Sequence, residues 1–340
     1  MTEIRKPTDE AIAKAADLIR AGEVVAFPTE TVYGLGADAR NAHAIEKIFA
    51  AKGRPQDNPL IVHISSLEQL SDVIEGELPP QARVLARRFW PGPLTMILPK
   101  GEAISPVCTA GLDSVGVRFP SNECAQKLIT ASGAPIAAPS ANVSGKPSPT
   151  SAMHVYGDLN GRIPLILDGG DCDVGLESTV ADVRYMPVRV LRPGGVTPEM
   201  IAEALGEVEV DGSVLRPLKQ GEVARSPGMK YKHYAPEGSL TIIKGSPENV
   251  AAKINALYDA AMGEKRILAL EQNRWRYGDR CVCSLGSDAA NAAHSLFRAL
   301  RDMDEQGVKS IFSEAIDTGG IGLAVMNRLG RAAAFHIIEV

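Results

Sequence analysis

The chain has 340 residues, which at roughly 150 residues per domain predicts two domains. Hydrophobic residues make up 45% and charged residues 23%, a composition that excludes disordered, collagen-like and coiled-coil proteins. The net charge of -5 provides no long-range attraction for nucleic acid, so such binding would need a local basic patch. With 5% aromatic residues, 32 glycines and 23 prolines, the chain fits an α/β protein with many tight turns.

Cysteine usage and hydropathy indicate where the protein resides. The five cysteines are odd in number and scattered, as is typical of a reducing compartment. Cys281 and Cys283 form a lone C-x-C, which favours two strand-borne thiols over a zinc site, and we assign no metal ligands. The first residues are polar, and no stretch approaches the roughly 18 apolar residues of a membrane span. We therefore expect a cytoplasmic protein.

Apolar periodicity predicts alternating helices and strands over residues 1–208. The first helix begins at Thr8, which can cap it, and ends at Gly22. Helices are also expected at 42–51, 81–89, 122–132 and 198–205, and strands at 24–27, 60–64, 94–98, 115–119, 136–138, 164–167, 179–183 and 188–191. The later strands follow one another through short turns, so the sheet is expected to be mixed.

The periodicity fails over residues 209–238, a segment with glycines and prolines that indicates a linker. It then restarts, with strands expected at 240–243, 267–270, 281–285 and 311–315 and helices at 247–261, 288–305 and 321–333. This βα repeat predicts a small doubly wound, Rossmann-like α/β domain over 239–340. The domains are thus expected at 1–208 and 239–340, joined by the linker.

Glycine-rich and hydroxyl-rich loops follow the first strand. No G-x-x-x-x-G-K-[ST] occurs, and the G-x-G-x-x-A at Gly34 lies six residues beyond its strand, which disfavours a dinucleotide fingerprint. The preceding sequence PTETVYGLG places Thr29, Glu30, Thr31 and Tyr33 after a buried strand, at an end where α/β sheets bind ligands. For either threonine alone, a local ST-turn is the better interpretation.

The sequence KGRPQDNPL follows the next helix. Gly53 fits the helix end and Lys52 suits the helix dipole, so a purely structural role is credible for both. Arg54 offers a bidentate fork for phosphate or carboxylate on a loop that Pro55 stiffens. His63 lies in the apolar strand LIVHI, where a lone histidine is more often a hydrogen-bonded core residue than a catalyst.

A third loop, PSANVSG at residues 139–145, follows a short strand. Its Ser140 and Asn142 could provide neutral hydrogen bonds to phosphate or a nucleobase, or form a turn with a helix cap at Thr150 or Ser151. Arg118 and Arg192 add cations at strand ends, each of which could instead form a surface salt bridge. Because no spacing marks a covalent nucleophile, these residues favour binding and positioning of anions.

The combination of motifs resembles a known family. PTETVYGLG, KGRPQDNPL, SVGVRFP, PSANVSG, ESTV, LRPGG and SPGMKYKHYAP, in this order, resemble the threonylcarbamoyl-AMP synthase family of YrdC-like proteins, in its long form with a carboxyl-terminal extra domain. The resemblance covers about residues 8–238. It implies an α/β fold with a YrdC-like twisted mixed sheet, while residues 239–340 match the extra domain in position and length only.

The resemblance also implies an activity and a set of residues. The family joins L-threonine, bicarbonate and ATP into threonylcarbamoyl-AMP and pyrophosphate for tRNA threonylcarbamoyladenosine modification, as a nucleotidyltransferase. Mg²⁺ is expected with the ATP. The implied catalytic residues are Lys52 and Arg54, and the threonine site contains Thr31, His63, Arg118 and Ser178. The implied ATP site contains Lys52 and Arg54 at the phosphates, together with Asn58, Ser114, Ser140, Asn142, Thr150, Arg192 and a linker tyrosine, Tyr231 or Tyr234.

Two rival functions stay open at this point. Carbamoyl transfer in hydrogenase maturation uses a similar domain, but this chain starts close to its first helix, so the additional modules of that family are expected to be absent. An RNA-binding module is disfavoured because residues 1–208 contain 25 acidic and 19 basic residues. Direct tRNA binding and contacts with tRNA-modification proteins stay undecided. The tyrosines and lysines of residues 226–236 predict that the linker closes over the active site as a lid. The alternative is that Tyr231 and Tyr234 only hold the two domains together.

Overall fold

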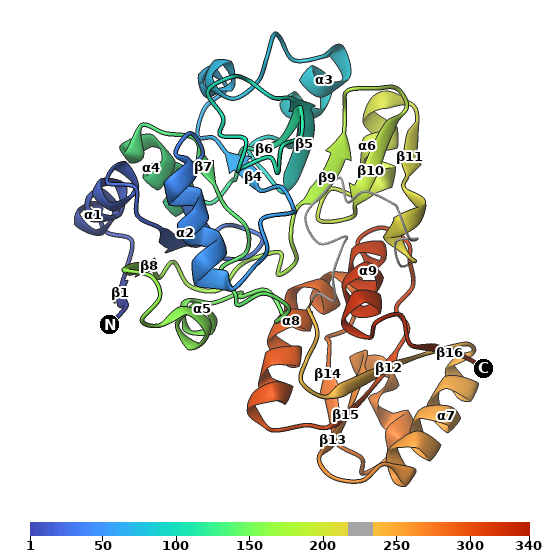
Figure 1. Cartoon of the computed structure of the whole chain (residues 1–340). Coiled ribbons are helices and arrows are strands. Elements are labelled where there is room, and N and C mark those ends of the chain that lie inside the picture. The colour runs from blue at the N-terminus through green and yellow to red at the C-terminus, as the bar shows by residue number, and fades with distance from the viewer. Residues whose placement is uncertain (217–233) are drawn as a thin grey trace. The chain divides into compact units, whose positions relative to one another are not determined.

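The computed structural model describes residues 1–216 and 234–340 (Figure 1). Internal contacts divide the chain into two compact units. The first contains Met1–Ser144 and Ser148–Val214, and the second contains Gly145–Pro147, residues 215–216 and residues 234–340. Most of the expected lid segment, including Tyr231, lies outside the described residues.

The first unit is built on an 11-stranded sheet with strand order β1-β8-β2-β3-β7-β4-β6-β5-β9-β10-β11. The strands are β1 (Glu3–Arg5), β2 (Val25–Phe27), β3 (Gly34–Asp38), β4 (Ile61–His63), β5 (Leu94–Pro99), β6 (Ser114–Arg118), β7 (Ile136–Ala137), β8 (Leu165–Leu167), β9 (Thr179–Asp182), β10 (Val188–Arg192) and β11 (Val208–Val210). Strand β4 pairs parallel with β6, whereas β5 pairs antiparallel with β6 and parallel with β9. The expected mixed sheet is confirmed.

Six α-helices and two 3-10 helices accompany this sheet in the described part of the unit. They are α1 (Asp9–Arg20), α2 (Ala42–Lys52), η1 (Glu68–Asp72), α3 (Pro80–Phe89), α4 (Glu123–Ser132), α5 (Ala152–Leu159), α6 (Pro198–Leu205) and η2 (Gly212–Val214). Thr8 caps α1 as predicted, because its hydroxyl accepts a hydrogen bond from the Ala11 amide. Gly53 ends α2 with a φ of 61°, a conformation that glycine adopts without strain.

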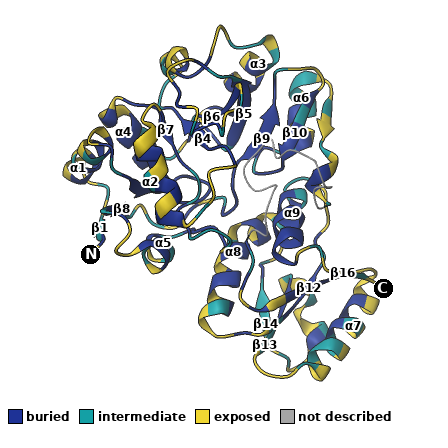
Figure 2. Cartoon of the chain, viewed as in Figure 1, coloured by how far each residue is buried: buried dark blue, intermediate teal, exposed yellow. Residues whose placement is uncertain are grey.

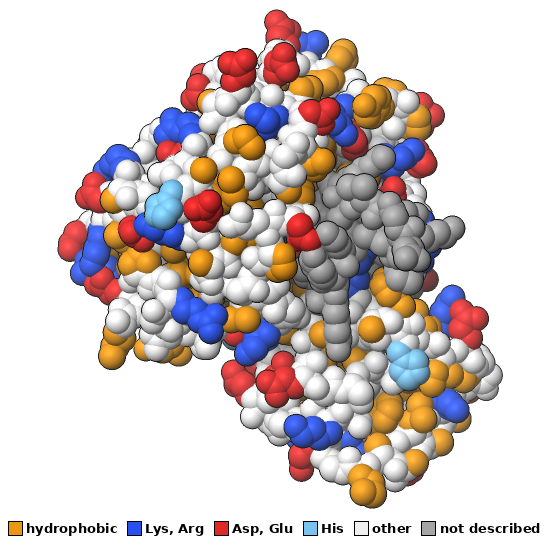
Figure 3. All heavy atoms as spheres, viewed as in Figure 1, with side chains coloured by type: hydrophobic (Ala, Val, Ile, Leu, Met, Phe, Trp, Pro, Cys, Tyr) orange, Lys and Arg blue, Asp and Glu red, His pale blue; other side chains and the backbone are white. Residues whose placement is uncertain are grey.

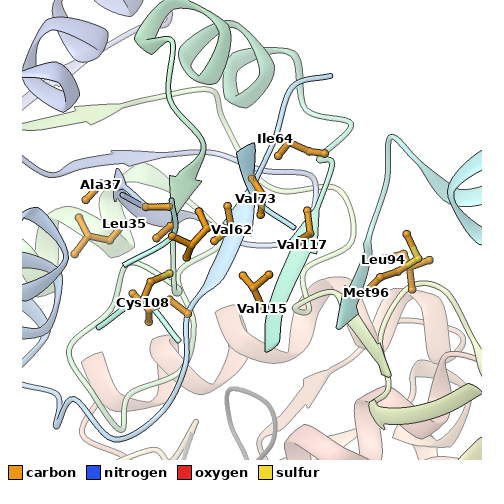
Figure 4. Close-up of a cluster of buried hydrophobic side chains, with 14 of the residues drawn as sticks. Leu35, Ala37, Val62, Ile64, Val73, Leu94, Met96, Cys108, Val115 and Val117 are labelled. Atoms are coloured by element: carbon orange, nitrogen blue, oxygen red, sulfur yellow. The ribbon is translucent and has the colours of Figure 1, made fainter. Parts of the chain in front are cut away.

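The central strands of the first sheet are buried (Figure 2), and its two faces pack into different clusters of side chains. One face packs into the larger core, and Figure 4 shows members of this core from neighbouring strands, including Leu35, Val62, Met96 and Val117. The opposite face packs against α1 and α4 near β2 and β8. Further along that face, Ile61, Ile97, Val180 and Leu191 form a small apolar cluster. This second face carries the candidate site.

Several elements were not expected from the sequence. Strand β3 is rich in glycine, a poor strand former, yet it pairs antiparallel with β2. Gly36 is required there because a Cβ atom would lie 2.6 Å from the ring of Phe27. Strands β1 and β11 pair parallel at the two edges of the sheet, and β11 lies partly in the segment expected as linker. Ser151 provides the cap of α5, by accepting from the His154 amide.

The second unit has a five-stranded sheet with order β14-β13-β15-β12-β16, and all its pairings are parallel. Its elements are β12 (Ser239–Lys244), α7 (Pro247–Ala260), β13 (Lys265–Ala269), η3 (Glu271–Tyr277), β14 (Val282–Ser284), α8 (Ala289–Glu305), β15 (Ser310–Glu314), α9 (Gly322–Ala332) and β16 (Ile337–Glu339). Helix α7 packs on β12, β13 and β15, whereas α8 packs against α9. The expected Rossmann-like α/β fold is confirmed, with β16 as an additional strand.

Charged side chains of both signs are interspersed over the face of the first unit that Figure 3 shows. Many of them are paired across short distances, such as Arg189 with Glu209 at 3.0 Å and Lys47 with Glu23 at 2.7 Å. Exposed pairs of this kind add little stability, about 0 to 1 kcal/mol each. Within residues 1–216 and 234–340, no helix is long and apolar enough to span a membrane.

Candidate functional site

A row of polar side chains crosses the second face of the first sheet, the face that carries Ile61, Ile97, Val180 and Leu191. His63 on β4 is in register with Arg118 on β6, and Arg118 is in register with Thr95 on β5. Residues that pair in this way point to the same face with Cβ atoms about 5 Å apart. All three are almost fully buried, at 3%, 4% and 0% exposure. Their neighbours along each strand belong to the core on the other face, so the row is fixed by strand alternation.

The loop after β2 brings a carboxylate to this row. Nη2 of Arg118 lies 2.8 Å from Oε1 of Glu30 and donates a hydrogen bond of 3.4 Å to the hydroxyl of Thr29. Strands β4 and β6 run opposite to β2, because β3 and β7 intervene with antiparallel pairings. The loop therefore reaches Arg118 by crossing the sheet face. The sequence analysis expected this loop at the edge of the sheet where the carboxyl ends of the strands meet. That rule applies to parallel sheets, and this sheet is mixed.

The hydroxyls of Thr29 and Thr31 have mainly local partners. Thr29 Oγ1 accepts from the amides of Thr31 and Val32 at 3.2 and 3.3 Å, which is the ST-turn considered as an alternative. The hydroxyls of Thr29 and Thr31 lie 2.8 Å apart. Thr31 is fully buried beside Glu30, so the turn fixes the loop with its carboxylate directed at Arg118.

A second group of side chains lies at the other end of the row. The hydroxyls of Thr95 and Ser178 are 2.8 Å apart. Arg192 donates from Nε to the carbonyl oxygen of Ser178 at 3.1 Å and from Nη2 to its hydroxyl at 3.2 Å. The structure thus joins Ser178, expected at threonine, with Arg192, expected at ATP. Because Thr95 is in register with Arg118, both groups belong to one continuous site.

His63 is held as a neutral imidazole in this row. Its Nδ1 lies 3.2 Å from the carbonyl oxygen of Ile61, and its ring packs edge-on against Phe27. Burial, followed by the positive charge of Arg118, lowers the pKa of His63 from 6.5 to about 3. At neutral pH His63 therefore contributes no charge to the site.

The depressed pKa of His63 predicts a specific acid sensitivity. The unfolded chain takes up a proton at His63 below about pH 6.5, whereas the folded chain does so only near pH 3, so stability falls as the pH decreases between these values. Between pH 6.5 and about pH 5, this protonation lowers the free energy of unfolding by about 1.5 kcal/mol. The variant His63→Gln should lack this pH-dependent loss. Urea unfolding at both pH values measures it, and the exposed His43→Gln is the control. Equal pH dependence in wild type and His63→Gln would contradict the prediction.

Lys52 organises the third loop. Its ammonium group is buried, donates to the carbonyl oxygen of Ser140 and donates to that of Asn142 at 2.6 Å. The hydroxyl of Ser140 donates to Oδ1 of Asn142 at 2.5 Å. The loop runs beside β3, because the Ala141 amide donates to the carbonyl oxygen of Tyr33. The structure thus brings Lys52, Ser140 and Asn142 together.

Arg54 and Asn58 lie on the segment that follows α2. Nη2 of Arg54 donates to the carbonyl oxygen of Asn58 at 3.3 Å, and its guanidinium lies over the ring of Phe49. The side-chain amide of Asn58 is buried, and neither its Oδ1 nor its Nδ2 bonds to any part of the chain that the structure describes. Such a group is costly to bury unless a ligand satisfies it.

The remaining expected site residues are more dispersed. Thr150 is buried, with its hydroxyl 3.4 Å from Nδ1 of His154. Ser114 lies four residues before Arg118 on β6, about 13 Å away at the usual rise per residue. It lines a cavity of about 340 Å³ with Ile97 and Asp182. Tyr234 belongs to the second unit, where its ring packs on Phe297 with centroids 5.1 Å apart.

Two residues, one in the row and one beside it, are absent from the sequence-based site. Thr95 was assigned only to a buried strand. The signal that could have identified it is strand alternation: because the adjacent Met96 faces the core, Thr95 points to the other face of the sheet. Glu30 was noted as the carboxylate of the PTETVYGLG loop, but received no role. Its proximity to Arg118 depends on the pairing of strands far apart in sequence, which the sequence does not reveal.

Comparisons with known proteins identify the family. A family model named for Sua5, YciO and YrdC and described as "Telomere recombination" matches residues 17–194. A second, described as "Threonylcarbamoyl-AMP synthase, C-terminal domain", matches residues 196–334. The chain belongs to the Sua5/YciO/YrdC family. The resemblance seen in the motifs is thereby confirmed, including the long form with its additional domain.

Relatives of this family match over the full length. The protein named threonylcarbamoyl-AMP synthase from Pyrococcus abyssi is 49% identical over 96% of this chain and 95% of its own. The protein of that name from Bacillus subtilis is 48% identical over 100% of this chain and 97% of its own. The crystal structure of P. abyssi Sua5 complexed with L-threonine matches with a TM-score of 0.93 at 46% identity, covering 100% of this chain and 99% of that one.

Proposed function

We propose that the chain is a threonylcarbamoyl-AMP synthase, which converts L-threonine, bicarbonate and ATP into threonylcarbamoyl-AMP and pyrophosphate. Full-length relatives at 48–49% identity carry this name. The observation that carries the proposal is the buried row of His63, Arg118 and Thr95, in a chain that matches a threonine-bound relative over its whole length. A buried guanidinium among hydroxyls is suited to an amino acid with a carboxylate and a hydroxyl.

In this proposal threonine lies over the row. Arg118 binds the substrate carboxylate, while Thr31, His63 and Ser178 surround the rest of the amino acid. The small apolar cluster of Ile61, Ile97, Val180 and Leu191 lies on the same sheet face and offers a surface for the methyl group. Because burial keeps His63 neutral, Arg118 is the cation of the row that attracts the carboxylate.

The ATP site is proposed along the neighbouring loops. Its residues are Lys52, Arg54, Asn58, Ser140, Asn142, Thr150 and Arg192, with Ser114 and either Tyr231 or Tyr234 assigned by the family resemblance alone. The unsatisfied amide of Asn58 supports this site, because a nucleotide could provide both its donor and its acceptor. Residues 1–216 and 234–340 contain no group of three His, Cys, Asp or Glu suited to a metal ion. We therefore propose that Mg²⁺ arrives bound to the phosphates of ATP.

The chemistry proposed is that of a nucleotidyltransferase. A carbamate formed from threonine and bicarbonate attacks the α-phosphorus, and pyrophosphate leaves. The chain's contribution is to hold the anions in line and to neutralise their charge with Arg54 and Arg192, without a covalent nucleophile. Lys52 contributes by fixing the loop that carries Ser140 and Asn142.

The product and the thiols suggest partners and location. The adenylate is prone to hydrolysis, so we propose that tRNA-modification proteins consume it directly. The five cysteines are free, and burial raises the pKa of Cys108 and Cys124 to about 12, so both stay as thiols. Free thiols support a cytoplasmic protein.

Pyrophosphate release tests the function. With ATP and Mg²⁺, the purified chain should release pyrophosphate only when both threonine and bicarbonate are present. Serine should react with a kcat/KM about tenfold lower, because a well-packed methyl group is worth about 1 kcal/mol or more. Product can be identified by mass spectrometry. Equal pyrophosphate release without threonine would contradict the proposal.

A further inference from the structure

Glu30 is a buried acid whose oxygens are available to a ligand. The residue is 5% exposed and lies on the loop that crosses the sheet face. Its Oε1 is 2.8 Å from Nη2 of Arg118, but within residues 1–216 and 234–340 neither carboxylate oxygen accepts a hydrogen bond of good geometry. A buried carboxylate without hydrogen bonds is unfavourable, so the site is incomplete without a donor.

The guanidinium of Arg118, next to Glu30, has a hydrogen-bond donor that lacks an acceptor among the described residues. Nε of Arg118 is buried and bonds to no partner in the described part of the chain. An unsatisfied donor therefore lies next to unsatisfied acceptors. The α-carboxylate and α-ammonium groups of one amino acid would satisfy both at once, because they carry the opposite charges at a similar spacing. A simple anion without donor hydrogens would leave Glu30 without a donor.

We propose that Glu30 binds the α-ammonium group of threonine and removes the proton that blocks its attack on bicarbonate. This assignment rests on the proposed function. The ammonium group transfers one proton to the Glu30 carboxylate and becomes a neutral amine. Its lone pair then forms the C–N bond with bicarbonate, whose hydroxyl leaves as water with an amine proton and leaves the carbamate anion. The carboxyl group of Glu30 returns its proton to water.

The titratable groups around Glu30 are few among the described residues. Arg118 faces it from β6, His63 adjoins Arg118 from β4, and Cys172 interacts with it from the segment after β8. Burial lowers the pKa of His63 and raises that of Cys172, so His63 is a weak base and Cys172 carries no charge at neutral pH. Together with the contact between Glu30 and Arg118, this assigns the proton to Glu30.

The test compares two directions of catalysis in Glu30→Gln, which keeps the shape but accepts no proton. Forward synthesis from threonine, bicarbonate and ATP should fall by about a hundredfold or more, as for loss of a general base. The reverse reaction, ATP formation from threonylcarbamoyl-AMP and pyrophosphate, needs no amine deprotonation and should stay within a fewfold of wild type. Raising the pH should narrow the forward deficit, because solution then supplies the unprotonated amine.

The outcomes separate the possible roles of Glu30. If both directions fall together, or if the forward deficit does not change with pH, Glu30 only holds Arg118 and the proposal is overturned. A wild-type chain that makes no adenylate overturns the proposed function and this assignment with it. The reverse reaction also reports whether the variant is folded. Asp38→Asn is the control, since Asp38 pairs with Arg40 at 2.8 Å on β3 and should leave both directions unchanged.

Discussion

Replacing Arg118 with methionine is expected to lower kcat/KM for threonine by about a hundredfold or more. The guanidinium is the buried cation of the row, and its removal takes away the partner of the substrate carboxylate while leaving Glu30 unpaired. Arg118→Lys keeps the charge but loses the planar fork, so a smaller loss of about tenfold is expected. Pyrophosphate release measured over a range of threonine concentrations gives both values.

Stability measurements distinguish this role from a general loss of folding. Breaking a buried ion pair from one side costs about 3 kcal/mol or more, so Arg118→Met should be clearly less stable than wild type. Adding Glu30→Gln removes the uncompensated charge and should restore much of the stability without restoring synthesis. The exposed Arg189→Met, which breaks a surface pair, is the control. If the double variant Arg118→Met/Glu30→Gln is no more stable than Arg118→Met alone, the energies of Arg118 and Glu30 are not coupled.

The sequence predicts most of the fold because periodicity and capping are local. Helix α1 follows from its apolar stripe and the hydroxyl of Thr8, and α2 ends where Gly53 adopts its left-handed conformation. Strand β3 could not be predicted, since its glycines have low strand propensity and are chosen for packing against the ring of Phe27. That packing exists only once β2 and β3 pair.

The site is less predictable, because its geometry depends on register. The sequence indicates Arg118 and His63 as separate residues, and each also has a purely structural interpretation, a salt bridge for Arg118 and a core hydrogen bond for His63. Only the pairing of β4 with β6 makes them neighbours. The loop with Glu30 crosses the sheet because three antiparallel pairings reverse the strand direction between β2 and β4. The resemblance places Lys52 at the phosphates of ATP. Its hydrogen bonds to the carbonyl oxygens of the third loop join residues far apart in sequence, so the sequence alone does not reveal them.

Lys52→Met is expected to lower synthesis by about a hundredfold or more through its effect on the third loop. The buried ammonium donates to the carbonyl oxygens of Ser140 and Asn142, and each hydrogen bond from a charged group contributes about 1.5 to 3 kcal/mol. Without them both carbonyls lose their charged partner, and the loop is held beside β3 only by backbone hydrogen bonds such as that from Ala141 to Tyr33. Initial rates of pyrophosphate release measure the loss.

Affinities for ATP and for adenosine decide how Lys52 acts. An ammonium has three donor hydrogens, and in the structure carbonyl oxygens take two of them, with Oδ1 of Asn142 at 3.4 Å beside the group. If Lys52 acts by holding the loop, Lys52→Met weakens binding of ATP and adenosine by similar factors. If it contacts phosphate, as the resemblance implies, ATP binding weakens far more than adenosine binding. Lys47→Met is the matched control, because Lys47 lies on the same helix and donates to the carbonyl oxygen of Gly22 at 2.8 Å, apart from the loop. Since the ammonium already has two charge-assisted bonds to carbonyls, we expect the two affinities to fall together.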